Sequence, residues 1–83
     1  MRKIEFVPNL NGFTKILLDS VELKTRINPY DIREYRYHLG KQYSIGYAYH
    51  IIETHLALLV KEISLDADET AFVIKYLKRE LGI

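Results

Sequence analysis

The histidines His38, His50 and His55 are the side chains of this sequence that could most directly serve a metal ion or a proton transfer. Two histidines that bind one metal ion from one face of a helix are three or four residues apart, whereas His50 and His55 are five apart. At about 100° per residue, their rings point roughly 140° apart on a helix, and on a strand they lie on opposite faces. The spacing therefore predicts no metal site, and we expect both residues on the flanks of a buried helix.

Other combinations that support catalysis are missing from the sequence as well. Ser20, Ser44 and Ser64 fall in predicted turns or helix starts, and none lies near a histidine in an elbow-like motif. The four glycines are too dispersed for a loop that cradles phosphate, and there is no cysteine to act as a nucleophile or metal ligand. Asp66 and Glu69 are better explained by helix-start chemistry than by acid–base catalysis. We predict a protein that is not an enzyme and that binds no cofactor and no metal.

Tyrosine is in surplus, with seven copies in 83 residues. On the predicted helices, aromatic, basic and apolar residues form second faces away from the core, and tyrosine and arginine are enriched at the energetic centres of protein interfaces. We predict a partner-binding surface made of Tyr30, Arg33, Tyr37, Phe72, Lys75, Tyr76 and Arg79. A minor apolar stripe on the second helix predicts self-association through Tyr47, Ile51 and Leu58. The competing interpretation makes the tyrosines ordinary amphipathic surface residues, or places them under the sheet with solvated hydroxyls.

The N-terminal third of the chain has the pattern of strands. Lys3–Val7 alternates polar with apolar residues, and Asn11-Gly12 then favours a hairpin whose two central residues have positive φ. Phe13–Leu18 is the predicted returning strand, Asp19-Ser20 marks a second turn, and Val21–Ile27 alternates again. The competing interpretation is a helix with Phe13, Ile16, Leu17 and Val21 on one face.

Two helices have clear boundary signals. Asn28 is a good N-cap before a proline at the first helical position, and Gly40 suits the left-handed position after the end, which predicts a helix over Pro29–Leu39. Asp66 and Glu69 have capping-box spacing, so a later helix begins there, continues to Leu81 and ends at Gly82. The expected core faces consist of Ile32, Tyr35 and Leu39 on the former and Val73, Ile74, Leu77 and Leu81 on the latter.

The segment between these two helices has two interpretations. Ser44 can cap a helix that runs to about Ile63, because apolar residues recur at alternating steps of four and three. That stripe consists of Ile45, Tyr49, Ile52, Leu56, Leu59 and Ile63. The alternative reads residues 43–65 as two further strands, which would need a tight turn at Glu53-Thr54 without glycine, asparagine or proline. We expect the helix.

Together these elements predict one small α+β domain over residues 1–83, with a β-rich part at 1–27 and a helical part at 28–83. Its N-terminal antiparallel β-meander or hairpin is followed by three helices packed on one face of the short sheet. A chain of this length buries only about 60–65 % of its unfolded surface, so a second subunit would add to a thin core.

The charge balance favours a protein as the partner. Twelve basic and eleven acidic side chains give a net charge of +1, which does not suit strongly electrostatic binding to nucleic acid or a membrane surface. No apolar run is long enough for a signal peptide or a membrane span, so we expect a cytoplasmic protein. These features are typical of small inhibitors, antitoxins and mobile-element regulators that act through protein–protein contacts, with a homo-oligomer expected.

DNA binding is the alternative function. In the order and rough spacing of its elements, the segment 21–63 resembles the ribbon-helix-helix repressors. This resemblance implies a dimer whose paired strands lie in the major groove, with Lys24 and Arg26 reaching base edges. The sequence departs from the pattern at Gly46 and His50, where apolar core residues are expected.

Overall fold

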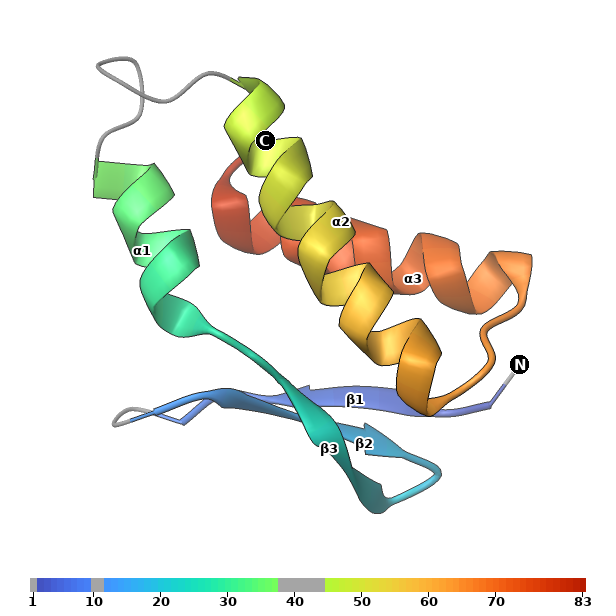
Figure 1. Cartoon of the computed structure of the whole chain (residues 1–83). Coiled ribbons are helices and arrows are strands. Elements are labelled where there is room, and N and C mark those ends of the chain that lie inside the picture. Colours follow the sequence, from blue (N-terminus) through green and yellow to red (C-terminus); the bar gives the residue numbers. More distant parts are fainter. Residues whose placement is uncertain (1, 10–11, 38–44) are drawn as a thin grey trace.

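The alternation of polar and apolar residues in the first third of the chain produces a three-stranded antiparallel sheet (Figure 1). The computed structural model describes residues 2–9, 12–37 and 45–83, the side chain of residue 37 excepted. The strands β1 (Ile4–Val7), β2 (Thr14–Leu18) and β3 (Val21–Ile27) lie in the order β1-β2-β3. This confirms the predicted meander, and the alternative helix over residues 13–21 is wrong.

The two faces of the sheet differ in chemistry, because successive side chains of a strand point to opposite sides. One face is apolar and is covered by the helices. On the other face, the Lys15 ammonium lies 3.3 Å from a carboxylate oxygen of Glu22, and the guanidinium of Arg26 lies 3.6 Å from the second oxygen. On the uncovered face, Glu22 therefore forms ion pairs with two cations, Lys15 from β2 and Arg26 from its own strand, β3.

The turn between β2 and β3 has the geometry expected of a tight hairpin. Leu18 pairs with Val21, and the two residues between them, Asp19 and Ser20, have φ values of 48° and 70°. Positive φ at both central residues is the signature of a type I′ turn. The sequence predicted this geometry for Asn11-Gly12, but Asn11 lies outside the described residues.

Three helices follow the sheet and confirm the α+β class: α1 (Pro29–Tyr37), α2 (Ile45–Glu62) and α3 (Ala67–Leu81). The Asn28 side chain accepts a hydrogen bond from the backbone N–H of Tyr30 at 2.9 Å, as an N-cap does. Residues 43–65 do not form two strands, because 45–62 is one continuous helix. The predicted end signal Gly40 and the predicted cap Ser44 lie outside the described residues, as does Leu39.

The ends of α3 are set by local sequence. Asp66 and Glu69 form the complete capping box, in which each side chain accepts a hydrogen bond from the other residue's backbone N–H. Gly82 follows the helix with φ 78°, and its N–H bonds to carbonyls of the last turn. This left-handed conformation favours glycine because a Cβ would be strained there.

The buried face of α2 is rotated from the predicted stripe. Ile45 and Tyr49, expected in the core, are 56 % and 43 % exposed, whereas the buried face consists of Ala48, Ile51, Ile52, His55 and Leu59. The physical reason is that α2 packs against β3 and α1 as well as α3. Because α2 must pack against all three elements at once, their positions determine which of its several apolar sides is buried.

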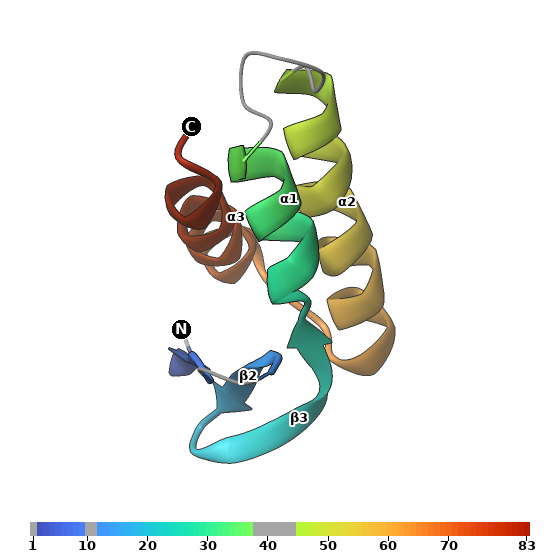
Figure 2. The same cartoon turned by 90° about the vertical axis from the view of Figure 1, so that its left-hand side faces the viewer.

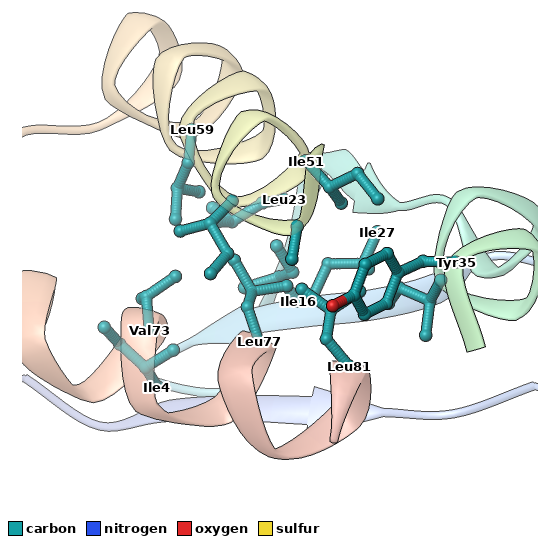
Figure 3. Close-up of a cluster of buried hydrophobic side chains, with 13 residues drawn as sticks. Ile4, Ile16, Leu23, Ile27, Tyr35, Ile51, Leu59, Val73, Leu77 and Leu81 are labelled. Carbon is teal, nitrogen blue, oxygen red and sulfur yellow. The ribbon is translucent and has the colours of Figure 1, made fainter. Parts of the chain in front are cut away.

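One hydrophobic cluster joins the sheet to all three helices (Figure 3). The helices lie on the same side of the sheet, which leaves the opposite face uncovered (Figure 2). Tyr35 of α1 is 1 % exposed in this cluster, and the predicted core residues Val73, Leu77 and Leu81 of α3 are fully buried. Within the described ranges, no helix combines the length and apolar character needed to cross a membrane.

Candidate functional site

The packing of α1 against α3 brings together two stripes that are far apart in the sequence. Arg33 belongs to the predicted stripe on α1 and Tyr76 to the one on α3, and both line a single cleft of about 270 Å³. Thr14 of β2 and two residues of the segment that joins β1 to β2, Pro8 and Asn9, complete its wall. The lining of this cleft consists of Pro8, Asn9, Thr14, Pro29, Ile32, Arg33, Arg36, Tyr76 and Glu80.

Tyr76 is held in place by an aromatic stack. Its ring lies parallel to that of Phe6 from β1, with 3.8 Å between the ring centroids, and Phe72 extends the cluster at 6.0 Å from Phe6. The guanidinium of Arg79 lies over the Tyr76 ring, 5.4 Å from its centroid. These contacts fix the ring at the edge of the sheet and also fix the guanidinium that rests on it.

The Tyr76 hydroxyl stays protonated at neutral pH. Burial raises the pKa of this phenol above its ordinary value of 10.0, and the negative charge of Glu80 adds to the increase. A hydrogen bond with Thr14 and the positive charge of Arg79 act in the opposite direction. The cleft therefore presents a neutral hydroxyl beside one carboxylate.

The α1 stripe is a surface feature, as predicted. The Tyr30 side chain is 59 % exposed, and the Arg33 guanidinium lies 5.9 Å from the centroid of its ring. Such a cation–π contact restricts the arginine without covering either group from a partner. The side chain of Tyr37, the third member of the stripe, lies outside the described residues.

The four predicted residues of α3 share a second depression next to the cleft. This open hollow of about 810 Å³ lies on the outer side of α3 and is lined by Ala71, Phe72, Ile74, Lys75, Tyr76, Lys78, Arg79 and Ile83. Tyr76 lines both hollows and thus connects the α1 stripe with the α3 stripe. We call the combined surface of Tyr30, Arg33, Arg36, Phe72, Lys75, Tyr76 and Arg79 the α1–α3 face.

The basic groups on the α1–α3 face form no ion pairs with the described residues. Arg33, Arg36, Lys75 and Arg79 form no ion pair with any residue in the described part of the chain. Among the described residues, Lys3, Lys15 and Arg26 form ion pairs on the sheet, and Arg2 forms one with Glu69. A surface with unneutralised cations beside exposed aromatic rings offers charge and apolar area to the same partner.

The three residues predicted for self-association are in different environments. Ile51 is 4 % exposed and belongs to the core, so it cannot contact another subunit. Tyr47 packs partly buried against the core, with its ring 6.4 Å from that of Tyr35. Leu58 is 48 % exposed and is the member of this set with substantial free surface. The three residues differ in exposure because the buried face of α2 is rotated from the predicted one.

The residues of the DNA-binding alternative lie on β3. Lys24 and Arg26 are exposed, but β3 pairs with β2 of the same chain, whereas the ribbon-helix-helix arrangement needs this strand to pair with a second copy. Its outer edge is also occupied, because the Glu62 carboxylate accepts hydrogen bonds from the backbone N–H groups of Lys24 and Thr25, both at 2.7 Å. The pairing of β3 therefore differs from that of the ribbon-helix-helix repressors, which the order of the elements resembles.

Sequence reasoning did not find the contacts that join distant elements. His55 is buried; its Nε2 accepts a hydrogen bond from the backbone N–H of Asn28 at 3.2 Å, and its Nδ1 lies 2.7 Å from the Ile51 carbonyl oxygen. These partners assign a neutral ring with the proton on Nδ1. Its role is structural, since it supports the residue that caps α1. In the described ranges, no three histidine, aspartate or glutamate side chains form a group that could hold a metal ion.

Comparison with protein-family models, with curated proteins and with solved structures found no match. The functional argument therefore rests on the geometry of this chain alone.

Proposed function

We propose that this protein is a non-enzymatic binding protein that acts through protein–protein contacts made by the α1–α3 face, and that it also self-associates. The observation that carries the proposal is the convergence of two stripes on one cleft, with Arg33 from α1 and Tyr76 from α3 in the same wall. Small inhibitors, antitoxins and regulators of mobile elements are the kinds of protein that act in this way.

The chemistry of the face supports a protein partner. Tyr30 and Phe72 expose large aromatic surface, which supplies much contact area at a small cost in side-chain entropy. Arg33 and Arg79 are held over tyrosine rings, so less of their freedom remains to be lost on binding. Aromatic residues and arginines in this arrangement form the centres of many interfaces.

Affinity capture with variants tests the proposal. The tagged full chain is incubated with lysate of its source cells, with and without nuclease, and the captured proteins are identified. Replacing Tyr30 and Phe72 by alanine should reduce capture of a protein partner by about tenfold or more, as loss of interface anchors does. Circular dichroism should show unchanged folding of this variant.

The matched control carries Lys24→Ala and Arg26→Ala on the opposite side of the molecule. This control should capture the partner as the wild type does, and nuclease should have no effect. Capture that requires nucleic acid and is lost in this control would contradict the proposal and favour the DNA-binding alternative.

A further inference from the structure

The cleft between α1 and α3 has room for one or two side chains. Its volume of about 270 Å³ lies below the roughly 300–1,000 Å³ of pockets that hold small-molecule ligands. Pro8, Pro29 and Ile32 give it apolar walls. A protruding side chain of a partner fits a space of this kind, whereas a helix or a cofactor does not.

Two guanidinium groups from one helix supply the charge of the cleft. Arg33 and Arg36 are three residues apart, so they lie on the same side of α1, and both line the cleft. The acidic residues of α1, Asp31 and Glu34, are not part of its wall. Within the described part of the chain neither arginine has an ion-pair partner, and Glu80 is the one carboxylate among the described residues that line the cleft.

We infer that this cleft, together with the cationic rim of the α1–α3 face, binds an acidic segment of a protein partner, with a carboxylate of that segment between Arg33 and Arg36. The inference rests on the proposed function and names the chemistry of its partner. Guanidinium groups match the two oxygens of a carboxylate, and Lys75 and Arg79 extend the positive surface for flanking acidic residues. An aliphatic side chain next to that carboxylate in the partner segment packs against the apolar walls of the cleft.

The same observations favour a peptide over nucleic acid. A nucleic-acid backbone carries a charge at every residue and gains affinity by neutralisation of many phosphates, but the chain has a net charge of only +1. The apolar walls of the cleft would also meet no apolar group of a phosphate backbone. A peptide that alternates acidic and aliphatic side chains can pair its carboxylates with the arginines and pack its aliphatic side chains against the apolar walls.

Titration of the isotopically labelled full chain tests the inference, with NMR shifts of backbone amides as the readout. The probes are a capped peptide of alternating glutamate and leucine, the same peptide with glutamine in place of glutamate, and a single-stranded DNA of equal charge. The glutamate peptide should shift the amides of Arg33, Arg36 and Tyr76, and the glutamine peptide should bind about tenfold more weakly or worse.

Substitutions of the charged residues that line the cleft test its role directly. Arg33→Gln with Arg36→Gln should weaken binding of the glutamate peptide about tenfold, and Glu80→Gln should strengthen it because a repelling charge is removed. Lys24→Gln with Arg26→Gln is the matched control and should bind as the wild type does. Equal binding of both peptides, tighter binding of DNA, or unchanged affinity in the Arg33/Arg36 variant would overturn the inference.

The outcome is separable from that of the proposed function. If a protein partner is captured in a manner that depends on Tyr30 and Phe72, but the Arg33/Arg36 variant still captures it, the proposed function stands and the acidic-segment inference fails. If the glutamate peptide binds at the cleft but no protein is captured through this face, the proposed function fails instead.

Discussion

At the scale of single residues, buried polar side chains connect elements that are distant in the sequence. His55 on α2 accepts the backbone N–H of Asn28, the residue that caps α1. Glu69 at the start of α3 accepts hydrogen bonds from the backbone and the guanidinium of Arg2, in addition to the bond from Asp66 that completes the capping box. Arg2 also donates to the Ser64 carbonyl oxygen. Each of these side chains therefore forms hydrogen bonds with two different residues of the chain.

Replacing His55 by phenylalanine should destabilise the protein. The substitution keeps a ring in the core but leaves the part-buried N–H of Asn28 without its acceptor, and an unsatisfied buried donor costs about 1–3 kcal/mol. Urea denaturation should show this loss in the free energy of unfolding. His50→Phe, on the exposed side of α2, should change it by less than about 0.5 kcal/mol. Equal effects of the two substitutions would contradict the role assigned to His55.

Glu69 should make stability depend on pH in the acid range. Hydrogen bonds from Arg2, first of all, and from Asp66 lower the pKa of this carboxyl from 4.5 to about 2. A carboxyl with a lowered pKa in the folded state stabilises the protein above its unfolded pKa, and this contribution is lost as pH falls from 4.5 toward 2. Glu69→Gln should therefore be less stable than the wild type at pH 7, and the difference should shrink across this range. Thermal melts at several pH values measure it, with Asp68→Asn as the exposed control; a difference independent of pH would contradict the argument.

At the scale of elements, the irregularity of β3 is tied to the end of α2. Lys15 pairs with Arg26 and Leu17 with Glu22, so Ile16 alone faces three residues of β3 and the strand bulges. The Glu62 carboxylate accepts hydrogen bonds from two of the three N–H groups of this bulge, those of Lys24 and Thr25. The bond from the Lys24 backbone is the main cause that lowers the pKa of Glu62. The side chain of Thr25 also donates to the Leu58 carbonyl oxygen at 3.4 Å.

Replacing Glu62 by glutamine should loosen this junction. The amide side chain keeps one acceptor oxygen but turns an NH₂ group toward the other backbone N–H, so one hydrogen bond is lost. We expect faster hydrogen exchange at Lys24 and Thr25 and a loss of about 1 kcal/mol in the free energy of unfolding. Glu53→Gln, on the exposed side of the same helix, should change neither property. Unchanged exchange at the bulge in the Glu62 variant would show that the carboxylate does not hold it.

At the scale of the whole molecule, charge and apolar surface are unevenly distributed. The uncovered face of the sheet carries ion-paired charges, whereas the cations of the α1–α3 face have no ion-pair partner in the described ranges. Further exposed apolar side chains lie on α2, where Ile45, Leu58 and Val60 are about half exposed on different sides of the helix. These are separate regions, so binding of a partner and self-association need not compete.

Self-association should depend on Leu58, the member of the predicted set with free surface. Replacing it by lysine places a charge at the contact, which should weaken association of the chain about tenfold or more. Sedimentation equilibrium over a range of concentrations measures this change, with Val21→Lys on the β2–β3 hairpin as the control. A wild type that stays monomeric at all concentrations, or a Leu58 variant that associates equally well, would contradict the prediction.

Local chemistry made much of the fold predictable from the sequence. The Asn28 cap, the capping box of Asp66 and Glu69 and the left-handed Gly82 each act within a few residues, so their side chains and backbones determine them wherever the helix packs. Alternating residues likewise gave the three strands and their apolar face. The exposed positions of Tyr30 and Phe72 followed from the same periodicities.

Only the tertiary structure decided which of these surfaces meet. The sequence of α2 has apolar residues on several sides, so its period is compatible with more than one buried face, and the contacts with β3, α1 and α3 selected the face with Ile51 and His55. The hydrogen bonds that join Lys24 of β3 to Glu62, Asn28 to His55 and Arg2 to Glu69 span 38, 27 and 67 residues. The cleft shared by Arg33 and Tyr76 arises in the same way, since the docking of α1 on α3 creates it. Hydrophobic periodicity indicates which residues share a face of an element. Which face is buried, and how the elements are placed relative to one another, depends on how all their side chains fill the common core.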